Sequence, residues 1–467
     1  MHRSRLAAVA LMSCVAVLAV ACGARVTPEQ RASLGGQSVI GAGRANASEA
    51  GSAASADVSA ADSAETDVSS SGGPGPAAET ATTVAPAERT ASDVGVTQDK
   101  MVLGHVTQLT GPVPGLFKGS TIGLLAYIAY QNSLGGIAGR KLEADIRDDQ
   151  FDASQNRTAT RELIAKSFAL VGGISLYDDA SAADVRESGI PDITTAISAT
   201  RAQIPNNFAP SPNVEGAPLV PWNYLKQKYP QVVTAMSSLY GDVPAAKHVH
   251  ESYRMAAESI GFEWVYDRGY QPTETDYTAD IIRMRQSGAK ALFLIAVDAK
   301  NIARILKAAQ QQGWKPEVVF VGSAGYDRAM STLAGSAAEG VQFFLPYALY
   351  AGEDAELIPE VRLMNQWVQK VSPGYVADGY TVGAWIAGRL FGQSMAKLGP
   401  NPTRKALNDV LRGVDHYDGN GLQADTGPGP KRPASCQLIA EFRDGKYRRL
   451  DPATRGFRCD APFWRRP

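Results

Sequence analysis

Histidine and cysteine are scarce in this chain, which has five histidines and four cysteines among 467 residues. None of the histidines lies beside a plausible nucleophile in a loop that follows a predicted strand. His248 and His250 are two residues apart, whereas metal pairs on a helix need a spacing of four. The phosphate-binding pattern G-x-x-x-x-G-K-[ST] and the serine turn G-x-S-x-G are both missing. The sequence therefore predicts no enzyme, no metal site and no cofactor.

Neither sign of charge dominates, because 46 basic side chains nearly cancel 47 acidic ones and leave a formal charge of −1. A protein that binds the phosphate backbone needs a strongly basic surface, so nucleic acid is excluded as a partner. The hydrophobic content of 44% and the charged content of 20% are typical of a globular protein.

The first 22 residues have the three-part layout of an export signal. Arg3 and Arg5 precede the apolar run Leu6–Val20, which is too short to span a bilayer comfortably. Small residues then lead to Cys22, an arrangement that resembles a bacterial lipobox, in which the cysteine is acylated. We predict lipidation of Cys22, with an ordinary cleaved signal as the alternative. A diacylglyceryl group supplies the two chains that stable anchoring requires.

Residues 23–98 lack aromatic side chains altogether and consist mostly of Ala, Ser, Gly, Thr and Val. Such a segment cannot bury enough apolar area to offset the entropy of its chain. We therefore expect a disordered tether between the anchor and a folded part, with a span of roughly 50 Å if it behaves as a flexible coil.

Residues 100–467 exceed what one hydrophobic core normally serves, so two lobes are expected. Strands alternate here with helices, which predicts right-handed crossovers and parallel sheets. The expected strands are 101–108, 141–147, 168–171, 191–195, 232–237, 263–270, 291–296 and 318–321, and the expected helices are 120–133, 153–166, 180–188, 245–260, 277–287 and 300–312.

Six loops that directly follow the predicted strands are rich in hydroxyl groups and glycine and poor in charge. Parallel sheets bind ligands at the carboxyl ends of their strands, so these loops are candidates for a small polar ligand. Helix caps and turns use the same residue types, which is the alternative explanation for any single loop. The loops contain Thr110, 173–175, 194–198, 237–241, 297–298 and 322–324.

Five motifs follow one another along the chain: Thr110-Gly111-Pro112, NSLGGIAGRK at 132–141, Asp148-Asp149, Leu170–Gly173 and ADGYTVGAWIA at 377–387. In this order they resemble the type I periplasmic binding proteins of the branched-chain amino acid ABC-transporter class. The resemblance extends over nearly all of residues 100–467.

The resemblance implies an α/β fold of two Rossmann-like lobes, each a parallel sheet flanked by helices, joined by three crossover strands. We expect the crossings near 210–213, 345–348 and 422–436. Lobe one is then 100–211 plus 347–425, and lobe two is 212–346 plus 426–460. The lobes of such proteins close around one ligand, which stabilises the closed form that a membrane permease recognises.

The resemblance also places ligand contacts on particular residues. From the first lobe it implies Ser175 or Leu176, together with Ala196 and Ser198, which in amino-acid binders hold the ligand carboxylate. Leu116 or Phe117 corresponds to a side-chain pocket, and Tyr240 to an aromatic lid. Thr110, Asp298 and Tyr326 complete the expected set of ligand-binding residues.

One position departs from the family pattern. The acid that pairs with the ammonium of an amino-acid ligand should follow the strand 318–321, and Ala324 stands there. Burying an ammonium without a counter-charge is costly. Either Asp298 or Asp327 replaces the missing acid, or the ligand is not an α-amino acid, which is the alternative that we favour.

Cys436 and Cys459 are the two thiols outside the signal, and they flank a predicted hairpin whose turn is Asp444-Gly445. Because export is expected, we predict a disulfide between them, with free thiols as the alternative.

Together these features predict a lipid-anchored solute-binding protein on the extracytoplasmic face of a bacterial cell membrane. It would act as a monomer and deliver a small organic ligand, an amino acid or a related carboxylate or aromatic compound, to an ABC-transporter permease. The alternative is a receptor of the same fold that signals to a membrane partner. A hydrolase would need a nucleophile and a base that the sequence does not offer.

Overall fold

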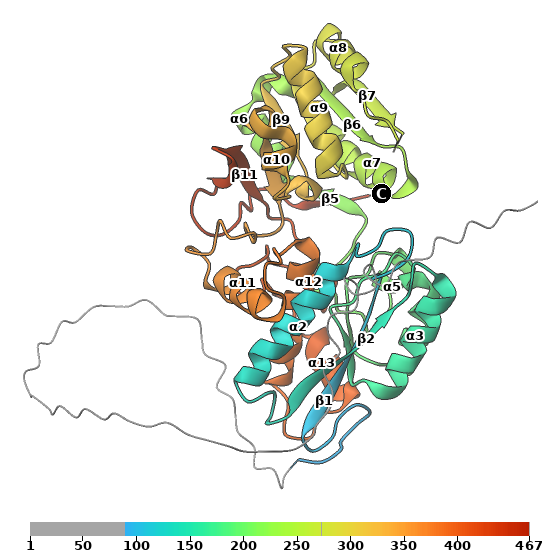
Figure 1. Ribbon diagram of the computed structural model, residues 1–467. Coiled ribbons are helices and arrows are strands. Elements are labelled where there is room, and N and C mark those ends of the chain that lie inside the picture. The colour runs from blue at the N-terminus through green and yellow to red at the C-terminus, as the bar shows by residue number, and fades with distance from the viewer. Residues whose placement is uncertain (1–88, 272, 467) are drawn as a thin grey trace, which may run out of the picture. The chain divides into compact units, whose positions relative to one another are not determined.

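A computed structural model describes residues 89–271 and 273–466 (Figure 1). The predicted export signal, Cys22 and residues 23–88 of the predicted tether lie outside the described residues.

The predicted boundary at residue 98 is wrong, because residues 89–98 are part of the fold. Val96 is buried in the core and pairs with Met101. The backbone N–H of Thr90 donates to Asn401 Oδ1 at 2.8 Å, and the Ser92 hydroxyl donates to the backbone oxygen of Pro402 at 2.6 Å. The low aromatic content of this stretch concealed these long-range contacts.

The first sheet has four parallel strands in the order β2-β1-β3-β4. Its strands are β1 (Lys100–Thr107), β2 (Lys141–Asp148), β3 (Ala169–Val171) and β4 (Asp192–Ile193). The helical segments between and after them are α2 (Lys118–Ser133), α3 (Ala153–Lys166), η2 (Asp178–Ser181), α4 (Ala182–Ser188) and α5 (Ala199–Ala202). The predicted helix 180–188 is thus divided into η2 and α4.

The second sheet has seven strands in the order β12-β11-β10-β9-β8-β6-β7, parallel from β7 to β10 and antiparallel beyond. Its strands are β6 (Met236–Gly241), β7 (Trp264–Tyr270), β8 (Ala291–Leu294), β9 (Val318–Val321), β10 (Gln342–Leu345), β11 (Leu438–Arg443) and β12 (Lys446–Asp451). The associated helical segments are α6 (Val220–Lys228), η3 (Pro230–Val232), α7 (Pro244–Glu258), α8 (Thr278–Gln286), α9 (Ala299–Gln311), η4 (Ser323–Gly325), α10 (Met330–Ala334) and η5 (Gly335–Ala338).

The remaining helices are α11 (Pro359–Val371), α12 (Gly379–Met395) and α13 (Arg404–Arg412), and β5 (Gly216–Pro218) pairs with β13 (Phe463–Arg465). Although α2 and α12 are far apart in the sequence, they run side by side (Figure 1). Asp378 begins α12 with a capping box, in which it accepts from Thr381 N at 2.8 Å. Because the two helices lie side by side, the N-terminal residues of α2 and α12 are close to each other.

The strand predicted at 232–237 begins four residues later than expected, at Met236, and extends to Gly241. Its serines are not in a loop. Ser237 donates to the backbone oxygen of Ala291 at 2.7 Å, and Ser238 donates to Asp267. These partners satisfy both hydroxyls inside the sheet, so a sequence that is typical of a loop forms a buried strand.

The three segments predicted as crossovers contact one another. Gln423 Nε2 donates to the backbone oxygen of Pro210 at 2.9 Å, and Ala424 N donates to Pro346 O at 2.8 Å. Tyr347 also pairs with Gln423. The assignment of residues to two lobes stays a prediction.

The C-terminal hairpin has the predicted form. Asp444 and Gly445 both have positive φ, of 54° and 71°, as a two-residue turn between β11 and β12 requires. The predicted disulfide between Cys436 and Cys459 is present and closes a loop over a sequence separation of 23.

Candidate functional site

A cavity of about 840 Å³ lies where the carboxyl ends of parallel strands from both sheets meet. Gly172, Ile174 and Thr195 line it from the loops after β3 and β4. The ends of β8, β9 and β10 contribute residues 296–299, 323, 324, 326–328, 345, 347, 350 and 351. The N-terminal ends of α2 and α12 complete the wall with Leu116, Ser120, residues 376–380 and Gly383. This is the place where parallel α/β sheets bind ligands.

Four tyrosines dominate this wall: Tyr326, Tyr347, Tyr350 and Tyr380. The rings of Tyr326 and Tyr350 pack edge to face with centroids 4.7 Å apart. Burial raises the pKa of both hydroxyls well above the ordinary value of 10. The phenols are therefore neutral, and the wall offers ring faces and edges to a ligand.

The Tyr326 hydroxyl is held by two hydrogen bonds. It donates to Glu353 Oε2 at 2.8 Å and accepts from Ala351 N at 3.0 Å. These two bonds orient the ring, so Tyr326 forms a rigid part of the wall.

Two aspartates at the cavity cap the N-termini of helices. Asp298 caps α9, because its Oδ1 accepts from Lys300 N and Asn301 N at 3.0 and 3.1 Å. Its Oδ2 accepts from Asn301 Nδ2 at 2.7 Å. Asp378 accepts from Thr381 and, through Oδ2, from the Tyr375 hydroxyl at 2.8 Å. Both carboxylates are thus already bonded within the protein.

Asp327 is the more available acid. It is exposed, lines the cavity, and accepts from Ala329 N at 2.7 Å through Oδ1 alone. Ala324, at the family's acid position, also lines the cavity.

The expected carboxylate anchors on the loops after β3 and β4 are bonded to acids of this chain. The Ser175 hydroxyl donates to Asp149 and accepts from Tyr177 N at 3.0 Å. The backbone N–H groups of Ile197 and Ser198 donate to Asp178 at 2.6 and 3.1 Å. Burial of Asp178 raises the pKa of its carboxyl above the ordinary value, although these bonds oppose the shift. Internal carboxylates therefore occupy the Ser175 hydroxyl and the Ser198 N–H, two of the donors that the resemblance assigns to a ligand carboxylate.

Only part of the predicted set lines the cavity. Asp298 and Tyr326 do, as does Leu116 rather than Phe117, the other candidate at that position. Phe117 is buried against the ring of Tyr380, with centroids 4.8 Å apart. Thr110 donates to Asp148 at 2.5 Å outside the lining.

The other predicted contacts lie elsewhere. Leu176 is exposed and Ala196 is buried, and neither lines the cavity. Ser175 and Ser198 are bonded to Asp149 and Asp178, as above. Tyr240 does not line the cavity either, because it belongs to β6, where its ring stacks on His250 with centroids 4.0 Å apart.

Sequence reasoning missed Tyr347, Tyr350 and Tyr380. Tyr380 lies within the motif ADGYTVGAWIA, which was used only for the resemblance, and the first two lie in and just after a segment expected as a crossover. The position of aromatic residues shortly after the end of a strand was the sequence feature that could have identified Tyr347 and Tyr350.

The family model for periplasmic binding proteins matches residues 100–446. The chain belongs to the periplasmic binding protein family. This confirms the predicted fold class, with parallel sheets flanked by helices. Members of this family bind small-molecule substrates, work with ABC-transporter permeases and are not enzymes. Membership also indicates an extracytoplasmic location.

Solved structures resemble this periplasmic binding protein in fold. A branched-chain amino acid ABC-transporter protein from Thermus thermophilus with bound valine has 16% identity and a TM-score of 0.63, covering 78% of this chain and 97% of its own. The branched-chain amino acid transporter substrate-binding protein from Streptococcus pneumoniae, in complex with isoleucine, has 16% identity and a TM-score of 0.61, covering 78% and 100%. A fatty acid ABC-transporter substrate-binding protein from Thermomonospora curvata has 19% identity and a TM-score of 0.61, covering 81% and 95%.

The comparison with curated proteins finds no significant match. Within the described residues, the helices of this periplasmic binding protein are too short or too polar to cross a membrane. The same residues contain no cluster of three or more His, Cys, Asp or Glu side chains that could hold a metal ion.

Proposed function

We propose that this chain is a lipid-anchored solute-binding protein of an ABC importer, and that its ligand is an organic molecule without an α-amino acid head group. The family supports ligand binding and a permease partner. The anchor at Cys22 and the nature of the ligand are the proposed parts.

One observation supports the ligand assignment: the groups expected to bind the carboxylate and the ammonium of an amino acid are both altered. Asp178 already bonds the N–H group of Ser198, which the resemblance assigns to a ligand carboxylate, and that of the neighbouring Ile197. At the other end, Ala324 replaces the acid that would pair with an ammonium. A charged head group would therefore lose its solvation without gaining matched partners, which costs several kcal/mol.

The remaining lining favours an apolar or aromatic body. Tyr347 and Tyr350 lie with ring centroids 6.4 Å apart, and Leu116, Val376 and Ala377 lie on the same cavity. Offset or edge-to-face contacts with a ligand ring are each worth about 1 kcal/mol beyond buried area.

A thermal-shift screen tests this assignment. We expect stabilisation by uncharged aromatic amides or alcohols and none by leucine, isoleucine or valine. At a hundredfold its dissociation constant, a ligand stabilises the native state by about 2.7 kcal/mol. The assignment would be overturned by a saturable thermal shift with an amino acid if Asp327→Asn removes that shift. Such a result would show that Asp327 pairs with the ammonium.

A matched pair of variants locates the binding. Tyr380 and Tyr177 are 37% and 36% exposed, but only Tyr380 lines the cavity. We expect Tyr380→Ala to weaken the response to the ligand and Tyr177→Ala to leave it unchanged. Equal effects of the two variants would contradict binding in this cavity.

The anchor and the importer role need separate measurements. Metabolic labelling with a radioactive fatty acid should mark the wild-type chain and not Cys22→Ser. Co-purification with an ABC permease from detergent-solubilised membranes supports import. Association with a sensor protein in its place would favour the receptor alternative.

A further inference from the structure

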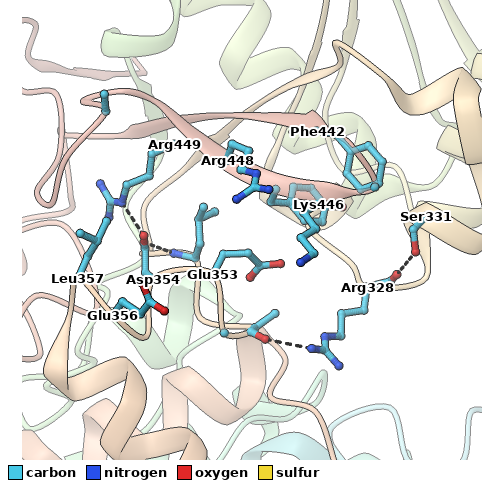
Figure 2. Close-up of a pocket in the computed structure, with 16 residues that line it drawn as sticks. Arg328, Ser331, Glu353, Asp354, Glu356, Leu357, Phe442, Lys446, Arg448 and Arg449 are labelled. Carbon is cyan, nitrogen blue, oxygen red and sulfur yellow. Dashed lines mark hydrogen bonds and ion pairs between the residues drawn. The ribbon is translucent and has the colours of Figure 1, made fainter.

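A second cavity of about 870 Å³ lies between the hairpin β11–β12 and the segment that follows β10 (Figure 2). It shares Arg328 and Ala351 with the proposed ligand cavity, but its other lining residues are different. Four cationic and three acidic side chains line it, so its character is far more polar than that of the tyrosine wall.

Strand β12 supplies three of the cations. Lys446 and Arg448 are exposed, and among the residues that the structure describes neither forms an ion pair. Figure 2 shows Lys446 pointing toward the middle of the cavity, with Glu353 facing it. Their charges are therefore available to a ligand.

Arg449 is the buried member of this group, with a side chain only 3% exposed. Its Nε pairs with Asp354 at 2.7 Å, and its Nη1 donates to the backbone oxygens of Thr454 and Gly456 at 2.7 and 2.9 Å. Its Nη2 is buried and has no acceptor within the described part of the chain. Because protein atoms enclose this nitrogen, Arg449 anchors β12 beside the cavity, and the exposed cations are the ones that a ligand can reach.

The acids of the cavity do not cancel this positive charge. Asp354 is fully used, because it pairs with Arg449 and its Oδ2 accepts from Leu349 N at 2.7 Å. Glu353 accepts the Tyr326 hydroxyl, and Glu356 is exposed on the same segment. With Arg449 and Asp354 paired, three cations face two carboxylates across the cavity.

We propose that this cavity is a second binding site, for a small organic phosphate or carboxylate that also carries hydroxyl groups. The anionic group binds the exposed side chains of Lys446 and Arg448. The hydroxyl groups donate to Glu353 and Glu356, whose carboxylates accept hydrogen bonds but repel a second anion.

Isothermal titration of the full-length chain in detergent with glycerol 3-phosphate tests the proposal, with sodium chloride of equal ionic strength as the reference. We expect saturable binding beyond the chloride reference. Lys446→Ala and Arg448→Ala should each raise the dissociation constant at least fivefold. Arg455→Ala is the matched control, because Arg455 is an exposed cation beyond β12 that does not line the cavity.

Three results would overturn the proposal. They are a response no larger than that of chloride, a response that Arg455→Ala weakens as much as Arg448→Ala, and a response that Tyr380→Ala removes. The last result would place the phosphate in the tyrosine cavity, which would also contradict the ligand class proposed for that cavity. If glycerol 3-phosphate binds here and no compound binds in the tyrosine cavity, the present proposal stands. Only the ligand class proposed for the tyrosine cavity is then overturned.

Discussion

Single residues decide which polar groups near the strand ends remain open to a ligand. Asp178 accepts the backbone N–H groups of Ile197 and Ser198. Beneath the cavity, the ring of His105 is fully buried, with Nδ1 3.0 Å from the backbone oxygen of Val171 and Nε2 3.3 Å from Ser120 Oγ. Ser120 itself lines the cavity. Buried side chains that do not line the cavity thus hold Ser120 in its wall and the amides of a neighbouring loop.

His105 should make stability depend on pH. Burial lowers its pKa from 6.5 to about 4, although the bond to Val171 opposes the shift. Because the folded state resists protonation, the stabilisation is complete above pH 6.5 and is lost as the pH falls toward about 4. Between about pH 6.5 and pH 5 the loss amounts to about 2 kcal/mol.

Urea unfolding of wild type and His105→Gln at pH 7 and pH 5 measures this effect. We expect the variant to lose about 2 kcal/mol less than wild type over that range. His416→Gln serves as the control, because His416 is 81% exposed. An unchanged pH response in His105→Gln would show that His105 is not the group that titrates.

Tyr240 gives a second prediction at this scale. Its ring stacks on the buried His250, so we expect Tyr240→Ala to lower the free energy of unfolding by about 1–3 kcal/mol. The response to a ligand in the tyrosine cavity should persist. Loss of that response with unchanged stability would restore the lid role that the resemblance implies.

At the scale of elements, α2 and α12 approach closely at glycine. A Cβ on Gly123 would lie 2.2 Å from the backbone oxygen of Thr381, and one on Gly119 would lie 2.1 Å from Asp378 Oδ1. Backbone atoms cannot move aside as the end of a flexible side chain can. The contact between the helices therefore depends on glycine, which has no Cβ, at these positions.

Gly123→Ala should therefore destabilise the protein by about 1–3 kcal/mol, despite the better helix propensity of alanine. Gly383→Ala in α12 is the matched control, because its Cβ would meet nothing nearer than Thr195 Oγ1 at 3.8 Å. We expect that control to leave the stability unchanged or to raise it by up to about 1 kcal/mol. Thermal unfolding of both variants provides the measurement, and equal stabilities would contradict the close approach.

At the scale of the whole molecule, the ends of parallel strands in two sheets supply the walls of one cavity. The segments near Pro210, Pro346 and Gln423 are hydrogen-bonded to one another. Three short connections of this kind are suited to a hinge, because few residues need to change conformation.

A ligand that touches both walls should shift the population toward a closed form. We expect small-angle scattering to show a smaller radius of gyration at saturating ligand for wild type, and no change for Tyr380→Ala. A radius that stays constant for a ligand shown to bind by thermal shift would rule out closure.

Much of the fold follows from local signals. The helix Ala153–Lys166 and the strand Val318–Val321 have the predicted bounds, because a capping residue or a short β-branched run marks each of them. The strand Met236–Gly241 was predicted four residues too early, at 232–237. Its serines bond partners on β7 and β8, which no local sequence pattern reveals.

The sequence by itself determined the alternation of strands and helices, the Asp444-Gly445 hairpin and the Cys436–Cys459 pair, because each depends on spacing along the chain. It also placed Asp298 and Tyr326 after the strands whose ends meet. Only the tertiary structure decided that Asp178 occupies the amides of the neighbouring loop, and that tyrosines from β10 onward form the wall. Those contacts join residues distant in sequence, and packing rather than periodicity selects them.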